Sequence, residues 1–150
     1  MVGRSGTAPQ RRPGRVLILA DTSAWVEFLR GTGHPVHHRL RTLLLEDRVA
    51  ITEVVVMELL AGARAGSEVR ELRSRLVALP ILPVEGLADF EEAALLYRTC
   101  REGGEIVRDL RDCVIAAVAI REGASVLHKD SDFDALGRHT GLRIEPVAAT

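Results

Sequence analysis

Four carboxylates stand apart from the other charged residues of this sequence. Asp21 and Asp130 each come at the end of an apolar run. Glu58 and Asp112 are lone charges in, or directly before, apolar stretches. Buried carboxylates without partners are costly, and a divalent cation is the simplest compensation because carboxylate oxygens suit Mg²⁺ or Mn²⁺. Such a metal activates water and neutralises charge on a phosphodiester, so the pattern favours phosphodiester hydrolysis; ordinary helix-capping carboxylates are the alternative that the spacing leaves open.

Polar residues near these four carboxylates also have competing interpretations. Asp109 is interpreted as a helix cap rather than a fifth ligand. Asp132 is either a metal contact through water or a solvated turn carboxylate, and Ser23 either supports the metal shell or caps its helix. Arg108 either holds a phosphate or pairs with Asp109, and the pairing is the simpler interpretation.

The elements that must position these residues alternate between short apolar strands and helices. Strands are predicted at residues 16–20, 49–51, 81–84, 124–127 and 142–144. Helices are predicted at residues 24–29, 36–46, 52–62, around 72–79, 87–101 and 110–121. This alternation is typical of a parallel α/β sheet, in which ligands bind at the carboxyl ends of the strands. Asp21 and Asp130 are predicted at such ends, and the helices of Glu58 and Asp112 can point toward the same crevice.

Length and composition exclude several classes of protein. The chain has 150 residues and a mass of 16.4 kDa, and 47% of the residues are hydrophobic and 27% charged, as in one soluble globular domain. Residues 1–15 hold four arginines and no acid, so they are predicted to be a disordered basic tail ahead of a single domain at 16–150. No apolar run approaches the roughly 20 residues that span a bilayer, and we expect a cytoplasmic protein with reduced thiols at Cys100 and Cys113.

Four segments of the sequence carry motifs that resemble those of PIN-domain ribonucleases. They are residues 19–25 (LADTSAW), 56–62 (VMELLAG), 112–117 (DCVIAA) and 127–133 (LHKDSDF). Together they are most similar to the VapC toxins of bacterial toxin–antitoxin pairs. The resemblance implies a three-layer α/β/α sandwich around a short, mainly parallel sheet, and an endoribonuclease that depends on Mg²⁺ or Mn²⁺.

The resemblance also implies roles for the four carboxylates. Asp21 and Asp112 would be the surest metal ligands, while Glu58 and Asp130 would complete the coordination or hold waters, with a metal-bound water attacking the phosphorus. Hydrolysis of a structured RNA, such as tRNA or rRNA, would inhibit translation and growth until a cognate VapB-like antitoxin neutralises the toxin. The family further implies a homodimer and no association with a membrane.

One position departs from the family's pattern. The family usually has a small hydroxyl residue, most often Thr, two positions before the fourth acid, and this chain has His128 there. If the hydroxyl supports the metal or the scissile phosphate, His128 must substitute for it as a hydrogen-bond donor to phosphate. The hypothesis is an enzyme that is less active or depends on pH.

Other classes of function remain open from the sequence. A catalytically inactive PIN-like module that binds RNA or protein would keep the same fold, and His128 leaves this alternative open. A receiver domain would also place acids at strand ends, but the predicted strand 81–84 has no aspartate to accept a phosphoryl group. His34, His37 and His38 have no cysteine nearby, so they are interpreted as exposed loop histidines rather than a zinc site.

Overall fold

The centre of the molecule is a short parallel sheet. The structure is a computed structural model that describes residues 15–148. Strand β1 (Ile18–Ala20) lies between β2 (Val49–Ala50) and β3 (Ser125–Leu127), and both pairings are parallel. Single parallel bridges, Ile51 with Ile81 and Val126 with Ile144, add one segment at each edge. The predicted parallel α/β sheet is therefore confirmed, although its outer strands at 81–84 and 142–144 are reduced to single bridges.

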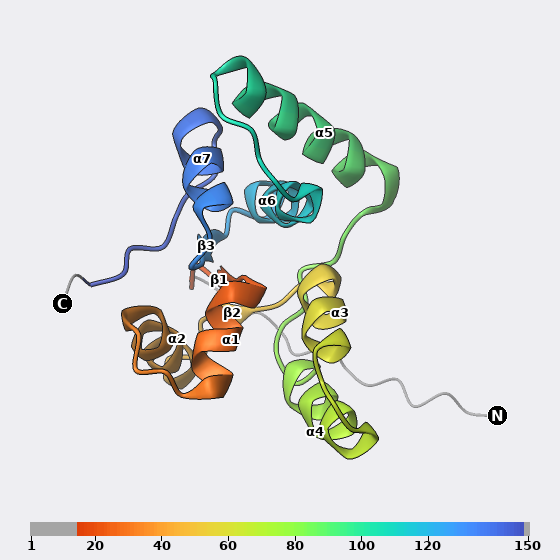
Figure 1. The fold of residues 1–150 in the computed structure, drawn as a ribbon, viewed down its shortest axis with the longest axis vertical. Helices are drawn as coiled ribbons and strands as arrows, with labels where there is room; N and C mark the ends of the chain where they lie inside the picture. Colours follow the sequence, from red (N-terminus) through yellow and green to blue (C-terminus); the bar gives the residue numbers. More distant parts are fainter. Residues whose placement is uncertain (1–14, 149–150) are drawn as a thin grey trace.

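Helices cover both faces of this sheet (Figure 1). Helices α1 (Thr22–Arg30) and α2 (Pro35–Leu45) pack against each other on one side. Helices α5 (Gly86–Glu102), α6 (Leu110–Glu122) and α7 (Ser131–His139) pack together on the other side. Helices α3 (Glu53–Ala61) and α4 (Gly66–Leu76) lie beside the sheet and contact each other. This arrangement confirms the three-layer α/β/α fold.

Helix α6 is the most deeply buried helix of the core. Every residue from 112 to 119 is buried, and the run consists of one acid followed by small and β-branched apolar residues. A helix that is apolar on all sides belongs inside a protein, and α5 and α7 enclose this one. The single charge in this run, Asp112, is consequently carried into the interior at the amino end of α6.

Two helices differ from the predictions. No helix is predicted after the last aspartates, whereas α7 occupies Ser131–His139. Its start is stabilised because the Asp130 side chain accepts a hydrogen bond from the Asp132 backbone N–H at 2.9 Å, and its Phe133 and Leu136 are buried. Helix α4 ends at Leu76 rather than at residue 79, since the chain must turn before the bridge at Ile81.

The edges and ends of the chain complete the description. At the outer edge of β3, the backbone N–H of Val126 donates to the carbonyl of Arg143, and the N–H of Glu145 donates to the carbonyl of Val126, both at 2.9 Å. Of the predicted tail, only Arg15 belongs to the described residues, where it is exposed and donates to the Glu46 carbonyl; residues 1–14 lie outside them. Among the described residues, no helix is long and apolar enough to cross a membrane.

Candidate active site

Three carboxylates from two helices meet at the carboxyl end of the sheet. Asp112 lies in the first turn of α6, Asp130 is the amino-terminal cap of α7 directly after β3, and Asp132 lies in the first turn of α7. One carboxylate oxygen from each lies within 4.8 Å of the other two. We call these three residues the acidic cluster.

Asp21 borders the acidic cluster from the end of β1. Its backbone N–H donates to the Leu127 carbonyl at 2.9 Å, which fixes it beside the end of β3. Its carboxylate accepts hydrogen bonds from the Ser23 N–H at 3.1 Å and the Ser23 hydroxyl at 2.6 Å. Burial raises the pKa of Asp21, with a smaller contribution from the charge of Asp130, so Asp21 shares the electrostatic environment of the cluster.

Glu58 approaches the same crevice from α3. Its carboxylate accepts a hydrogen bond from the Thr22 hydroxyl at 3.2 Å and lies 3.7 Å from the guanidinium of Arg111. Burial raises the pKa of Glu58 and the charge of Asp21 adds to this, while Arg111 opposes it. The four carboxylates predicted from sequence therefore converge, with Glu58 and Asp21 at the border of the cluster and Asp132 added within it.

Asp112 is the most perturbed group of the site. It is 6% exposed, and its Oδ2 atom is buried with no hydrogen-bond partner among the described residues. Burial raises the pKa of Asp112 from its ordinary value of 3.8 to about 9, and the charges of Asp21 and Asp130 contribute further. Without a cation, the site favours a proton on this carboxylate.

Asp132 is buried, which contradicts its interpretation as a solvated turn carboxylate. It is 5% exposed, and its Oδ2 accepts hydrogen bonds from the backbone N–H groups of Arg108 and Asp109, both at 3.1 Å. These bonds tie the start of α7 to the loop before α6. The sequence signal is limited because Asp and Ser are favoured both in exposed turns and at helix starts.

The structure separates the roles of the nearby arginines and Asp109. Asp109 caps α6, as predicted, by accepting from the Arg111 backbone N–H at 2.9 Å. The side chain that pairs with Asp109 is Arg111, at 2.7 Å, and not Arg108. Arg108 instead lies 3.5 Å from Asp132 and 3.9 Å from Asp130, with its guanidinium largely exposed. The predicted Arg108–Asp109 pair is thus wrong, because the side chain two residues into the helix reaches back to the cap.

Ser23 links the ends of two strands rather than capping its helix. Asp21 is the cap of α1, and the Ser23 hydroxyl both donates to Asp21 and accepts from the backbone N–H of Lys129 at 2.8 Å. The Lys129 ammonium in turn lies 2.7 Å from Glu27 on α1. The only lysine of the chain therefore holds the turn after β3 against α1.

His128 has partners on both ring nitrogens. Its Nδ1 accepts a hydrogen bond from the Asp130 backbone N–H at 3.0 Å, and its Nε2 lies 3.4 Å from the Asp134 carboxylate. Its ring lies 5.3 Å from that of Phe133, and burial lowers its pKa. His128 therefore holds the turn between β3 and α7 in a neutral form.

The three neighbouring histidines lie at and within α2 rather than in an exposed loop. His34 caps this helix by accepting from the Val36 backbone N–H at 3.1 Å, and His37 accepts from the Gly33 N–H at 3.0 Å. The acidic cluster is the sole group of at least three potential metal-ligating side chains found among residues 15–148. His34, His37 and His38 do not belong to that group.

Comparison with known families decides the classification. Residues 18–139 match the PIN domain family. This chain belongs to the PIN-domain family. Among PIN-domain proteins, it is 45% identical over 129 residues to ribonuclease VapC11 of Mycobacterium tuberculosis, a match that covers 85% of this chain and 96% of the relative. The resemblance to VapC proteins is therefore confirmed.

Solved structures share the same PIN-domain fold. FitAcB from Neisseria gonorrhoeae superposes with a TM-score of 0.67 and 25% identity, covering 87% of this chain and 97% of the other. VapBC2 from Rickettsia felis, bound to a DNA fragment from its promoter, superposes with a TM-score of 0.69 and 19% identity, covering 89% and 100%. At 19% identity the second likeness supports the fold alone.

The donor set of this PIN domain fits a divalent cation. The acidic cluster supplies hard oxygen ligands, and the buried Oδ2 of Asp112 is an acceptor that no donor of residues 15–148 satisfies. A bound cation would stabilise the charged carboxylates that burial and mutual repulsion otherwise disfavour. The chemistry of these residues therefore suits a divalent cation that prefers oxygen ligands.

Proposed function

We propose that this PIN-domain protein is a metal-dependent endoribonuclease that acts as the toxin of a VapBC-type pair. The acidic cluster, with the unpartnered Oδ2 of Asp112, is the observation that carries the proposal. The relatives named ribonuclease VapC support the reaction, and one of them is 45% identical to this chain over 96% of its own length. A structured RNA such as tRNA or rRNA is the proposed substrate, and inhibition of translation and growth is the proposed outcome.

Each residue of the site has a proposed role in this reaction. Asp112 and Asp130 would hold Mg²⁺ or Mn²⁺ together with Asp21, and Glu58 and Asp132 would complete the acidic environment. The cation supplies charge neutralisation on the phosphodiester oxygens and lowers the pKa of water. Ser23 orients Asp21 through two hydrogen bonds.

Two further side chains have proposed roles, one in orienting Glu58 and the other in binding the substrate. Thr22 holds Glu58 by donating a hydrogen bond to its carboxylate. The guanidinium of Arg108, 74% exposed beside Asp130, is placed to bind a phosphate of the RNA strand.

The proposed partners follow from the same relatives. Solved structures that share this fold include toxin–antitoxin complexes, so we propose a cognate VapB-like antitoxin for this chain. A homodimer in the cytoplasm is the proposed active form. Copurification of a coexpressed antitoxin, followed by release of nuclease activity when it is removed, tests the pairing.

RNA cleavage by the purified chain tests the proposed function. Total cellular RNA is incubated with antitoxin-free protein and Mg²⁺ or Mn²⁺, with and without EDTA. Discrete fragments should appear only without EDTA, and Asp112→Asn and Asp21→Asn should each reduce cleavage about 100-fold, as expected for loss of a metal ligand or its support. Asp47→Asn, an exposed acid in the turn after α2, is the matched control and should cleave normally.

Two outcomes of this assay contradict the proposal. Failure of the folded, metal-loaded chain to cleave any RNA would indicate a binding module instead of an enzyme. Cleavage that persists in Asp112→Asn and Asp21→Asn would show that the acidic cluster is not the active site.

A further inference from the structure

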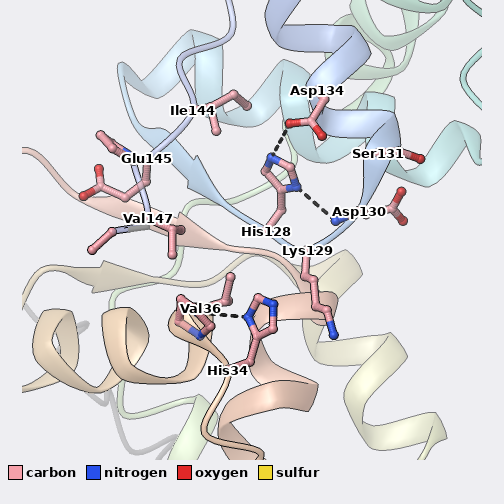
Figure 2. A pocket seen from close by; sticks show the side chains of 13 residues that line it. His34, Val36, His128, Lys129, Asp130, Ser131, Asp134, Ile144, Glu145 and Val147 are labelled. Carbon is pink, nitrogen blue, oxygen red and sulfur yellow. Dashed lines mark hydrogen bonds and ion pairs between the residues drawn. The ribbon is translucent and has the colours of Figure 1, made fainter. Parts of the chain in front are cut away.

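A second hollow adjoins the acidic cluster on the other side of the β3–α7 turn. It has a volume of about 680 Å³ and lies between the start of α2, the turn 128–131 and the carboxyl-terminal segment 144–148. Figure 2 shows this groove, with His128 near its centre and the carboxyl-terminal segment opposite Lys129. Asp130 belongs to both places, because it lines the groove while its carboxylate joins the cluster.

The polar side of the groove holds the carboxylates of Asp130 and Asp134 and also Lys129, whose ammonium lies 2.7 Å from Glu27. Asp134 lines it, is 54% exposed, and has one carboxylate oxygen 3.4 Å from the Nε2 of His128. In Figure 2 the His128 ring lies directly below Asp134, so the imidazole holds the carboxylate at the groove. An ionised carboxylate only accepts hydrogen bonds, so the position beside Asp134 favours a ligand that presents N–H groups.

The opposite side of the groove is apolar and fixed in place. Val36, Ile144 and Val147 contribute side chains to it. The segment that carries the last two is held by the pairing of Val126 with Ile144. It is also held by the Arg39–Glu145 ion pair at 2.5 Å, in which Glu145 is buried. A flat, partly apolar ligand can therefore lie between this wall and the His128 ring.

We propose that this groove binds a nucleobase of the RNA, next to the nucleotide whose phosphate lies at the acidic cluster, and that Asp134 accepts a hydrogen bond from the exocyclic amino group of that base. This inference rests on the proposed function. A base combines an apolar face with N–H donors at its edge, and single-stranded RNA is recognised by extruded bases in such pockets. The volume is also within the usual range of small-molecule sites. Because Asp130 belongs to both the acidic cluster and the groove, an RNA strand whose phosphate lies at the cluster would place its next nucleotide at the groove.

Nucleoside titration of the protein tests this inference without metal or RNA. The chain carries ¹³C-labelled Val and Ile methyl groups, and cytidine, uridine or ribose is added while the methyl resonances of Ile144 and Val147 are followed. Cytidine and uridine are the matched pair, since cytosine has an amino group where uracil has a carbonyl oxygen. Cytidine should shift these resonances in a saturable way, and uridine should bind about three- to tenfold more weakly, the cost of one hydrogen bond.

A variant pair assigns the preference to Asp134. Asp134→Asn keeps an acceptor for His128 but removes the charge, and it should reduce the cytidine preference to about twofold or less. Asp47→Asn should leave the preference unchanged, because Asp47 lies at the opposite end of α2 from the groove.

Several results would overturn the inference. These are equal shifts with ribose alone, equal affinity for cytidine and uridine, or a cytidine preference that Asp134→Asn retains. Resonances that shift with protein concentration and not with nucleoside would show that a second copy of the chain covers the groove. Because the titration needs no catalysis, cytidine binding without RNA cleavage would overturn the nuclease proposal and leave the base site standing.

Discussion

Among single residues, Asp112 bears the largest electrostatic cost of the site. It is buried beside other carboxylates and keeps one oxygen without a hydrogen-bond partner among the described residues. Such an arrangement destabilises a folded protein unless a cation or a proton is supplied. Asp112 should therefore lower the free energy of unfolding of the metal-free protein, and it should bind a metal ion when one is supplied.

The pKa of Asp112 predicts how stability depends on pH. Its pKa lies at about 9 in the folded protein against an ordinary value of 3.8, so between these values the folded state binds more protons than the unfolded state. The free energy of unfolding of the metal-free protein should consequently fall as pH rises across this window. Thermal unfolding in EDTA at pH 5, 7 and 9 measures the trend.

Asp112→Asn should remove this penalty and stabilise the metal-free protein. At pH 7 we expect a gain of about 1–2 kcal/mol, or about 3–6 °C in Tm, because the Asp112 carboxyl must take up a proton when the metal-free chain folds, whereas the amide is neutral already. Mg²⁺ should raise the Tm of the wild type more than that of the variant. Asp109→Asn is the control on the same helix and should not raise the Tm, because the hydrogen bonds of Arg111 lower the pKa of Asp109. A lower Tm for Asp112→Asn in EDTA would contradict the prediction.

The candidate residues could be found from sequence where a charge interrupts an apolar stretch. Asp21, Glu58, Asp112 and Asp130 all met that criterion, and the structure brings them to one end of the sheet. Asp134 was missed because it stands among other polar residues, and its significance depends on the position of α7. Contacts such as Arg111 with Glu58 join residues distant in sequence, and no local pattern reveals them.

At the scale of elements, the pairing of α5 with α6 depends on a buried ion pair. Arg121 near the end of α6 donates to both carboxylate oxygens of Asp89 in the first turn of α5, at 3.1 and 3.0 Å. Asp89 is 3% exposed and also accepts from the Glu85 backbone N–H at 2.7 Å. This network fixes the helix that carries Asp112 against its largest neighbour.

Arg121→Met should destabilise the fold substantially. Removal of the guanidinium leaves the Asp89 charge buried without its partner, and we expect a loss of about 2 kcal/mol in the free energy of unfolding, measured in urea at pH 7. Asp89→Asn should cost less, about 1 kcal/mol, because no buried charge is left and the amide oxygen still accepts a hydrogen bond. Arg138→Met, which breaks an exposed pair with Glu105, is the control and should change stability little. Equal losses for Arg121→Met and Arg138→Met would contradict a special role for the buried pair.

The elements were predicted best where their pattern was long and least well where they are short. The helix 110–121 and the strand 124–127 closely match α6 and β3, since both are continuous apolar runs. The nine-residue α7 was missed because its start looks like a turn and only two of its apolar residues carry the pattern. The edge segments at Ile81 and Ile144 pair with strands that are distant in sequence. Their own sequences therefore do not specify how many residues of each segment will pair.

In the folded molecule, the thiols of the two cysteines should react only slowly. Cys100 and Cys113 are buried and free, and burial raises the pKa of both thiols, that of Cys113 to about 12. Thiolates are the reactive form, so the folded protein should react slowly with the disulfide reagent DTNB, and unfolding in urea should release both thiols. Fast reaction of either cysteine in the folded protein would contradict this packing.

The pairing of β3 with residues 143–145 also bears on how truncated chains would behave. A chain that ends at Leu142 would leave the outer backbone groups of β3 unpaired, and an open strand edge recruits strands from other molecules. We expect such a chain to accumulate as insoluble aggregate even though every carboxylate of the site is present. In a genetic screen for harmless variants, stop codons at positions 143–145 would therefore be recovered as if they were active-site mutations.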